Sequence, residues 1–339
     1  MWDVRIACAS VAFGVAFAQV PAETLAADFF AGKTITVLNS GDAGGGFDTY
    51  TRILAKHLGK YIPGNPTIVI KGVPGGGGLR AAQQLYIAPK DGTTIGNLRS
   101  SNVLDSILGI RGTEVLMSEY NWLGSMGSDT DICSFWHTAG VKTLDDLRKK
   151  EVIVGASGKG AQNYSFPNAM NEILGTKMKI ILGYKGTADR LLALERGELQ
   201  GNCGIYASSI ASLNMQLVES GKLVPVVQSG LTPSSSFPNV PLTQSFATND
   251  RDRKLLTALF SQMEIARVFA APPDLPKDRV AILRSAFASA LADPELLAET
   301  RQLGSGPQLV SGERVDAIVR EMQDLPQDLK DTLKGLVGE

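Results

Sequence analysis

The chain has 339 residues, with 33 lysines and arginines against 34 aspartates and glutamates and a formal net charge of −1. This balance argues against nucleic acid or an anionic membrane surface as the main partner. The length is sufficient for two domains of ordinary size.

The N-terminus has the pattern of a secretory signal peptide. An unbroken run of small and apolar residues covers positions 6–17, follows Arg5 and ends in Ala16-Phe-Ala18, which fits a cleavage site. The run is shorter than the ~20 residues that a membrane-spanning helix needs. We therefore expect residues 1–27 to be a leader that is removed on export, with 20–22 and 24–26 as alternative cleavage sites.

Two strand, glycine loop and helix units follow. The first has a predicted strand at 33–38, the loop 41–48 with Gly44, Gly45 and Gly46, and a predicted helix at 49–58 with Asp48 as its N-cap. The second has a strand at 67–71, a loop at 74–78 and a helix at 79–85.

Neither loop is a nucleotide-binding fingerprint. Ala27 stands where the pattern G-x-x-x-x-G-K-[ST] needs its first glycine, and position 49, where G-x-G-x-x-G needs its last, is a threonine. Two glycine loops that both precede helices can aim backbone N–H groups at an anion. Plain chain reversal is the alternative for each loop.

The alternation of strands and helices continues through the chain. A third glycine loop covers 156–160 and a fourth covers 185–187. The further predicted strands are 93–98, 121–126, 132–136, 151–155, 179–184 and 223–228, and the further helices are 102–108, 144–150, 164–174, 188–197, 276–303 with a break at 293–294, and 314–323. This order predicts an α/β fold with mostly parallel sheets, in which ligands bind at the carboxyl ends of strands.

Cysteines and histidines limit the chemistry. Removal of the leader leaves Cys133 and Cys203, an even pair that predicts a disulfide in an oxidising compartment, with two buried free thiols as the alternative. The only histidines are His57 and His137, and no G-x-S-x-G nucleophile elbow occurs. We therefore expect no metal site, no cofactor and no enzyme, although a periplasmic hydrolase is a remote alternative.

Six stretches, in order along the chain, resemble the Bug-type periplasmic substrate-binding proteins of tripartite tricarboxylate transporters. They cover nearly the whole mature chain. The stretches are Ala43-Gly-Gly-Gly-Phe-Asp-Thr-Tyr-Thr-Arg52, Pro74-Gly-Gly-Gly-Gly78, Ala88-Pro-Lys-Asp-Gly92, Gly183-Tyr-Lys-Gly186 with Arg196-Gly-Glu198, Phe237-Pro-Asn-Val-Pro241 and Ala271-Pro-Pro-Asp-Leu-Pro276.

The resemblance implies a two-lobed Venus-flytrap fold in which the chain crosses twice between lobes. Lobe one would comprise residues 28–130 and 255–339, and lobe two residues 131–254. The implied function is capture of a small carboxylate in the periplasm and delivery to the membrane subunits of a transporter, by a monomer that does not bind nucleic acid. A ligand-sensing adaptor for a two-component sensor kinase is the alternative.

The resemblance also assigns ligand-binding positions. They are Gly44, Gly45, Gly46, Asp48, Gly75, Gly76 and Gly77 on lobe one, and Ser157, Gly158, Tyr184 and Gly186 on lobe two. Asp42, Phe47 and the unbroken glycines of the second loop depart from the family pattern, and they leave the size and chemistry of the ligand open. For Arg52 a surface ion pair, for Tyr184 simple packing and for Ser157 a helix cap are the alternative roles.

Overall fold

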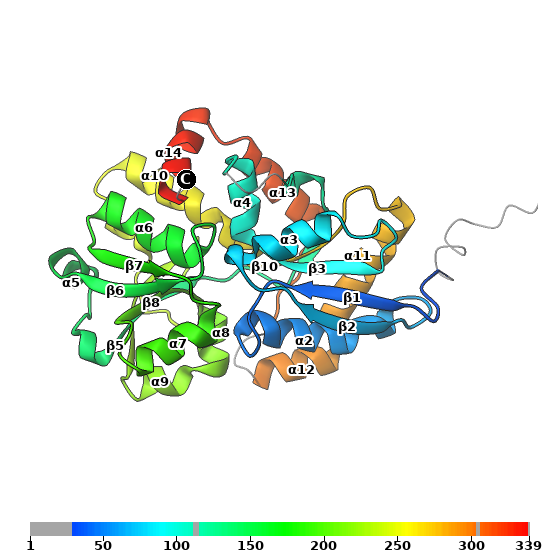
Figure 1. The fold of residues 1–339 in the computed structure, drawn as a ribbon, viewed down its shortest axis with the longest axis horizontal. Helices are drawn as coiled ribbons and strands as arrows, with labels where there is room; N and C mark the ends of the chain where they lie inside the picture. The colour runs from blue at the N-terminus through cyan, green and yellow to red at the C-terminus, as the bar shows by residue number, and fades with distance from the viewer. Residues whose placement is uncertain (1–28, 111–114, 303–305, 338–339) are drawn as a thin grey trace, which may run out of the picture.

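The computed structural model describes residues 29–110, 115–302 and 306–337, and the predicted leader lies outside these ranges. The described chain forms two lobes side by side, each with its own sheet (Figure 1). Among the described helices, none combines the length and the apolar character needed to cross a membrane.

The first lobe is built on a six-stranded mixed sheet. Its strands are β1 Thr34–Asn39, β2 Thr67–Gly72, β3 Thr94–Arg99, β4 Asn121–Ser125, β10 Arg267–Ala271 and β11 Val310–Ser311. The strand order is β11-β4-β10-β3-β1-β2. β1 is parallel to β2 and β3, whereas β10 is antiparallel to β3 and β4.

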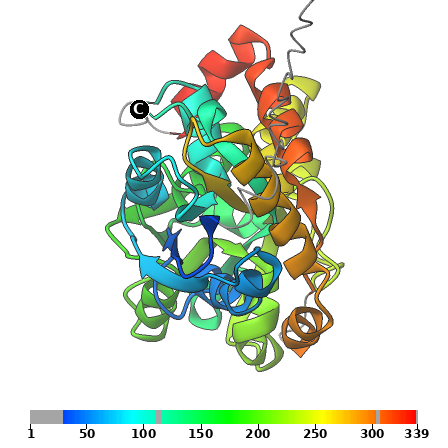
Figure 2. The same cartoon turned by 90° about the vertical axis from the view of Figure 1, so that its right-hand side faces the viewer.

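Six helices pack against this sheet or against one another. They are α2 Gly46–Leu58, α3 Leu79–Tyr86, α4 Ser100–Ile107, α11 Lys277–Leu291, α12 Pro294–Gln302 and α13 Gly312–Gln323. The sequence of α2 explains its packing. Its apolar face recurs at spacings of three and four residues and is buried, and it consists of Phe47, Tyr50, Leu54 and Leu58. Figure 2 shows the C-terminal helices, orange to red, extending over the full height of one side of the molecule.

The second lobe has a five-stranded mixed sheet in the order β7-β6-β8-β5-β9. The strands are β5 Asp131–Trp136, β6 Val152–Ala156, β7 Met178–Leu182, β8 Gly201–Tyr206 and β9 Leu223–Ser229, and the helices are α5 Leu144–Lys149, α6 Gln162–Leu174, α7 Thr187–Glu195, α8 Ala207–Leu213 and α9 Met215–Glu219. β6 is parallel to β7 and β8, and β5 is antiparallel to β8 and β9.

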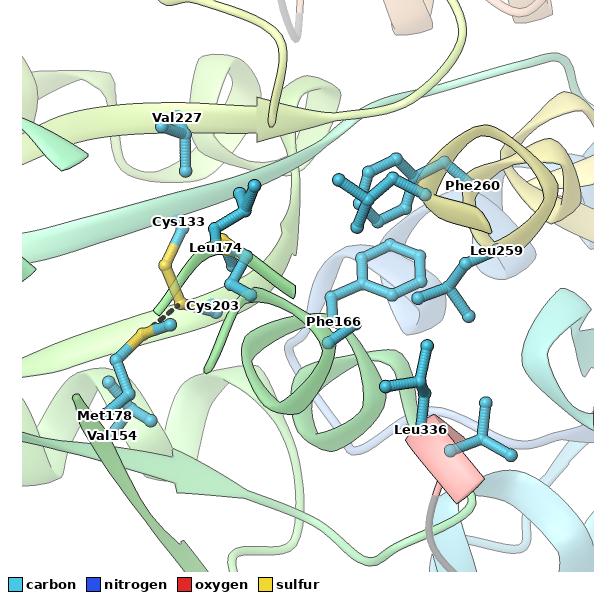
Figure 3. Close-up of a cluster of buried hydrophobic side chains, with 14 of the residues drawn as sticks. Cys133, Val154, Phe166, Leu174, Met178, Cys203, Val227, Leu259, Phe260 and Leu336 are labelled. Atoms are coloured by element: carbon cyan, nitrogen blue, oxygen red, sulfur yellow. Dashed lines mark hydrogen bonds between the residues drawn. A yellow bond between two sulfur atoms is a disulfide. The ribbon is translucent and has the colours of Figure 1, made fainter. Parts of the chain in front are cut away.

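Two helices connect the lobes at their outer side. α10, Asp250–Phe260, and α14, Gln327–Val337, both pack against α6 of the second lobe. Figure 3 shows Phe166 of α6 facing Phe260 and Leu259 of α10 and Leu336 of α14, and the two phenylalanine rings lie 4.8 Å apart in an edge contact. The C-terminal end of the chain therefore completes the core of the second lobe.

The structure gives the predicted α/β fold with two lobes, but its sheets are mixed. Only the halves that carry the glycine loops, β2-β1-β3 and β7-β6-β8, are parallel. All pairs that involve β5 or β10 are antiparallel, and so is the pair of β11 with β4. β5 and β10 are the first strands after the chain crosses from one lobe to the other, and each runs against its neighbours in the sheet.

A disulfide joins Cys133 of β5 to Cys203 of β8 inside the core of the second lobe (Figure 3). The half-cystines are 70 positions apart in sequence, and both are buried. The bond therefore fixes β5 against β8 beneath α6.

We predict that mass spectrometry of the non-reduced protein will find a Cys133–Cys203 linked peptide. Breaking the bond with a Cys133→Ala and Cys203→Ala double substitution should lower the free energy of unfolding by about 2–4 kcal/mol, because the unfolded chain regains the freedom of a long loop. Full alkylation of both thiols without reductant would contradict the pairing.

Candidate functional site

The glycine loops of both lobes meet where the two sheets face each other. Each loop follows the carboxyl end of a parallel strand: the first follows β1, the second follows β2, and the loop 157–161 follows β6. This is the edge at which open α/β sheets place ligands. The site is therefore an interlobe one, and its parts come from distant stretches of the chain.

The first loop is held by Asp48, and the expectation that Asp48 is the helix N-cap is corrected by the structure. Gly45 is the N-cap of α2, and Asp48 lies in the first turn, where it is buried. Its carboxylate accepts hydrogen bonds from Asn39 Nδ2 at 3.1 Å, Gly44 N at 3.0 Å and Arg52 Nε at 2.8 Å. Asp48 thus orders the loop from within, and the largely exposed Arg52 side chain forms an ion pair with this buried carboxylate.

The second loop approaches the other lobe through its backbone alone. Gly75, Gly76, Gly77 and Gly78 all have positive φ angles, from 57° to 117°, a region that side chains disfavour. A Cβ on Gly77 would lie 2.9 Å from the carbonyl carbon and oxygen of Gly160. Only glycine permits this close approach between the lobes.

Asp42 of the first loop caps a helix of the opposite lobe. Its carboxylate accepts hydrogen bonds from Thr187 N at 3.3 Å and Ala188 N at 3.1 Å, at the start of α7. α7 has no side-chain cap of its own, because its N-cap residue is Gly186, whose hypothetical Cβ would overlap Asp42. An acidic group at a helix N-terminus is stabilising, so Asp42 favours the closed arrangement of the lobes.

Aromatic rings and a guanidinium occupy the centre of the interface. The Phe47 ring lies 5.5 Å from that of Tyr206, at the end of β8, and the Arg99 guanidinium lies over Phe47 at 4.7 Å. Tyr206 donates a hydrogen bond to the carbonyl oxygen of Ala266, 2.7 Å away. Phe47 is therefore packed between the lobes, and the guanidinium group of Arg99 lies against its ring.

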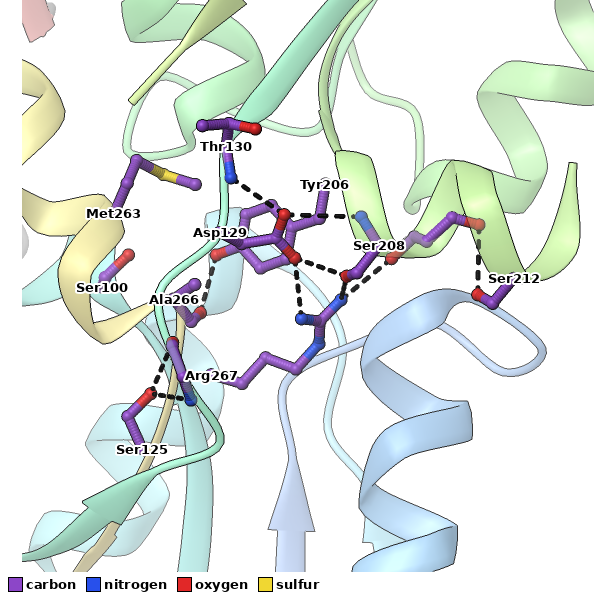
Figure 4. Close-up of polar contacts among 12 residues, drawn as sticks. Ser100, Ser125, Asp129, Thr130, Tyr206, Ser208, Ser212, Met263, Ala266 and Arg267 are labelled. Atoms are coloured by element: carbon purple, nitrogen blue, oxygen red, sulfur yellow. Dashed lines mark hydrogen bonds and ion pairs between the residues drawn. The ribbon is translucent and has the colours of Figure 1, made fainter. Parts of the chain in front are cut away.

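A second guanidinium ties the lobes together at the crossovers. Arg267 of β10 pairs with Asp129 at 3.0 Å and donates to Ser208 Oγ at 2.8 Å and Ser209 Oγ at 3.0 Å (Figure 4). Its guanidinium also stacks on Tyr50 at 4.3 Å. Arg267 belongs to the first sheet, and both serines belong to α8 of the second lobe. The side chains of the Arg267–Asp129 ion pair are both buried.

Asp131 is a buried carboxylate in an unusual environment. It begins β5, pairs across the ladder with Tyr206, and is 2% exposed. In the described part of the chain neither of its carboxylate oxygens accepts a hydrogen bond. Burial raises the pKa of Asp131 to about 8, with repulsion from Asp129 adding to the effect and attraction from the nearby arginines opposing it.

The remaining predicted residues of lobe two divide into two groups. Gly158 lies at the interface, because its hypothetical Cβ would be 3.5 Å from Gly77 N. Ser157 is bonded within its own lobe, since its N–H donates to Asn163 Oδ1 at 3.0 Å. Tyr184 packs over Gly155 and joins the apolar cluster around Leu199, and its contact with a ligand stays a prediction.

The residues with charge at the interface, Arg99, Asp131 and Arg267, escaped the sequence analysis. Each lies at one end of a strand, and no glycine motif surrounds it. Their proximity depends on how the two sheets face each other. The sequence offered one indication of these residues: a charged residue stands directly before an apolar strand segment, as Asp131 does before Ile132 and Arg267 before Val268.

Solved structures of periplasmic binding proteins resemble nearly the whole chain. The periplasmic binding protein BugD matches with a TM-score of 0.73 and 18% identity over 91% of this chain and 98% of its own. MatC from Rhodopseudomonas palustris, solved with bound malate, matches with a TM-score of 0.71 and 18% identity over 90% and 100%. R. palustris Rpa4515, solved with adipate, has a TM-score of 0.71 and 16% identity over 89% and 97%.

The chain has the fold of the Bug-type periplasmic binding proteins. The predicted resemblance is thereby confirmed at the level of the fold. No protein-family model matches the sequence, and no curated protein matches it.

The two histidines lie away from the interface of this Bug-type fold. His57 is buried between α2 and α12, with Nδ1 3.3 Å from Asp293 and Nε2 3.1 Å from Glu299. His57, Asp293 and Glu295 approach one another closely enough to suggest metal ligands. Lys60, however, pairs with Asp293 in the same cluster, and its ammonium group neutralises the carboxylate where a cation would bind.

We predict that Asp129→Ala lowers the free energy of unfolding by about 3–5 kcal/mol, because it leaves the Arg267 charge buried without its partner. Glu321→Ala is the control, since Glu321 forms a 2.7 Å ion pair with Arg314 in which both side chains are largely exposed. That substitution should cost no more than about 1 kcal/mol. Urea unfolding measures both, and equal losses would contradict the assigned importance of the crossover pair.

A second prediction concerns pH. The folded-state pKa of Asp131, about 8, lies above the ordinary value of 3.8, so between these values the folded chain binds more protons than the unfolded chain. Its contribution to stability is therefore complete below pH ~4 and is lost as the pH rises towards 8. Asp131→Asn removes this loss and should raise the melting temperature more at pH 8 than at pH 5. An equal change at both pH values would contradict the raised pKa.

Proposed function

We propose that this protein is a periplasmic solute-binding protein that captures a small organic carboxylate between its lobes and delivers it to the membrane subunits of a tripartite tricarboxylate-type transporter. The observation that carries the proposal is the meeting of glycine loops from both lobes at one interlobe edge. Malate and adipate, the ligands of MatC and Rpa4515, are both small carboxylates, and these proteins share the fold.

The carboxylate is proposed to bind next to Gly46, Gly76, Gly77 and Gly158, with the Arg99 guanidinium nearby. Gly46 begins α2, whose N-cap makes no side-chain hydrogen bond, and its hypothetical Cβ would overlap Ser209 of the other lobe. Backbone N–H groups at such a helix start bind anions through hydrogen bonds and the helix dipole. A ligand there would contact both lobes and so favour their closure.

A binding role without catalysis is part of the proposal. Neither histidine lies at the interlobe edge, since His57 is paired with α12 and His137 follows β5 at the opposite end of its strand. The polar groups that do lie there, such as Asn163 and Ser157, bond to each other within one lobe. The hydroxyl of Ser157 therefore has an amide as its partner, and Asp129, the carboxylate that accepts from the Ser208 hydroxyl, is already paired with Arg267. Neither arrangement resembles a nucleophile activated by an available general base.

A thermal-shift screen with dicarboxylates, tricarboxylates, aromatic acids and amino acids tests the proposal. A ligand present at 100 times its dissociation constant should stabilise the protein by about 2.7 kcal/mol. The absence of a shift with every carboxylate in the screen would contradict the proposed function.

We predict that Gly77→Ala weakens binding of any carboxylate found in the screen by at least about tenfold. The added Cβ would meet the backbone of Gly160 at 2.9 Å, and a smaller population of the closed form raises the apparent dissociation constant in proportion. Calorimetry measures the loss.

Gly175→Ala is the matched control for this variant. Gly175 has a φ of 70°, close to the 65° of Gly77, but nothing lies within 4 Å of its hypothetical Cβ. The two substitutions therefore introduce similar backbone strain, and only one of them obstructs the contact between lobes. Equal affinities in both variants would show that this contact does not support binding.

A further inference from the structure

Asp42 brings its own carboxylate to a place where two helices begin. From the first lobe it reaches the start of α7 in the second lobe, where Thr187 N and Ala188 N donate to it. On its other side lies Gly45, the N-cap of α2, whose hypothetical Cβ would be 2.8 Å from Asp42 Oδ1. Two helix N-termini, one from each lobe, therefore flank a single carboxylate.

The start of α7 accommodates this carboxylate because it lacks a side chain. The N-cap of α7 is Gly186 and that of α2 is Gly45, and neither helix start has a side-chain cap of its own. Free N–H groups and the helix dipole at such a start attract an anion. A Cβ on Gly186 would overlap the Asp42 carboxylate, so any other residue at this position would exclude the anion.

A buried positive charge next to the start of α7 adds to the attraction. Arg190 of α7 is buried and donates to the carbonyl oxygens of Gly186 at 3.3 Å and Cys203 at 2.7 Å. Burial and repulsion from Arg99 lower the pKa of Arg190 to about 10, and attraction from Asp42 opposes them. The guanidinium therefore stays charged at neutral pH and favours an anion at the start of its helix.

We propose that Asp42 fills, with its own carboxylate, an anion site formed by the starts of α2 and α7, so that the lobes close without a ligand and a ligand carboxylate is kept out of that site. The closure goes beyond the proposed function, whereas the exclusion rests on it. Charge-assisted hydrogen bonds are stronger than neutral ones, so the contact raises the population of the closed form. A ligand bound next to Gly46 would find the donors of α7 already taken and a negative charge beside them.

Small-angle X-ray scattering of the ligand-free protein tests the closure. Asp42→Ala should increase the radius of gyration, because two N–H groups of the second lobe lose their acceptor in the first. Asp91→Ala is the matched control, since half-buried Asp91 also accepts two hydrogen bonds, from Thr93 N at 2.9 Å and Thr93 Oγ1 at 2.6 Å, but within one lobe. The control should keep the native radius, and a native radius in Asp42→Ala as well would overturn the closure.

Formate tests the anion site directly, because it has the size of the group that Asp42→Ala removes. Excess formate should return the radius of gyration of this variant to the native value, and an equal concentration of chloride should not. Gly186→Ala should also open the lobes, but formate should fail to close them, because the added methyl group occupies the place of the anion. Equal effects of formate and chloride, or equal rescue of both variants, would overturn the anion site.

Calorimetry with matched acids tests the exclusion. Adipate and hexanoate have the same chain length and differ by one carboxylate, and so do succinate and butyrate. Asp42→Ala should shift the preference within a pair towards the diacid by about tenfold, as expected for hydrogen bonds gained by a charged group. The monoacid should bind more weakly to the variant than to the native protein, because fewer molecules are closed.

The outcomes separate this inference from the proposed function. An unchanged preference in both pairs, or no binding of either diacid to Asp42→Ala, would overturn the exclusion while the carboxylate-binding function stands. Silence of the whole carboxylate screen would overturn the proposed function and the exclusion with it. The scattering and formate experiments need no transported ligand, so they decide the closure in either case.

Discussion

The positive charge of Arg267 is buried where the chain crosses between lobes, and most groups that neutralise or bond it come from outside its own lobe. Asp129 lies on the crossover from β4 to β5, and Ser208 and Ser209 begin α8. Removing Asp129 leaves an uncompensated charge in a medium of low dielectric constant, and removing either serine leaves a guanidinium N–H group without its hydrogen-bond partner. The relative position of the two sheets near the crossovers therefore follows from this one ion pair and its hydroxyl contacts.

The contacts that Asp42 and Gly77 make between the lobes are weaker than the buried ion pair of Arg267. Asp42 caps α7 through two hydrogen bonds at a partly exposed position, and Gly77 meets Gly160 through backbone contact alone. If the lobes separate to admit a ligand, these contacts cost less to break than the buried pair at Arg267. The region of Arg267 then acts as the hinge, and the glycine loops act as the edges that close.

The sequence predicted the local units well and the interface poorly. The strands, glycine loops and helices around residues 33–58 and 67–85 could be predicted because turn chemistry and hydrophobic periodicity are local. β8 escaped prediction because Gly201-Asn-Cys-Gly204 alternates small and polar residues, and Gly204 has a φ of 79° that marks an irregularity in the strand. α14 escaped because its apolar face packs against α6, more than 150 positions earlier in sequence.

Asp48 and Asp42 show the same limit within the site. Local propensity correctly placed an acidic residue near the start of α2, but the register of the helix was set by Gly45, and the carboxylate of Asp48 bonds the loop instead. Asp42 departs from the family pattern for a reason that no local rule contains, because the helix that it caps is 145 positions away in sequence. Such roles can be recognised only once the two lobes are placed against each other.

An interlobe site lined mainly by the backbone of glycine loops has little intrinsic specificity. Glycine N–H groups bind any carboxylate of suitable shape, so they distinguish little between ligands. Discrimination must come from the few side chains that reach the interface with unsatisfied groups, because a polar group left unpaired in a buried site penalises the wrong ligand more than a good contact rewards the right one. In the described part of the chain, Arg99 and Asp131, one from each lobe, carry buried polar atoms without a hydrogen-bond partner. A penalty of this kind is therefore already present at the interface between the lobes.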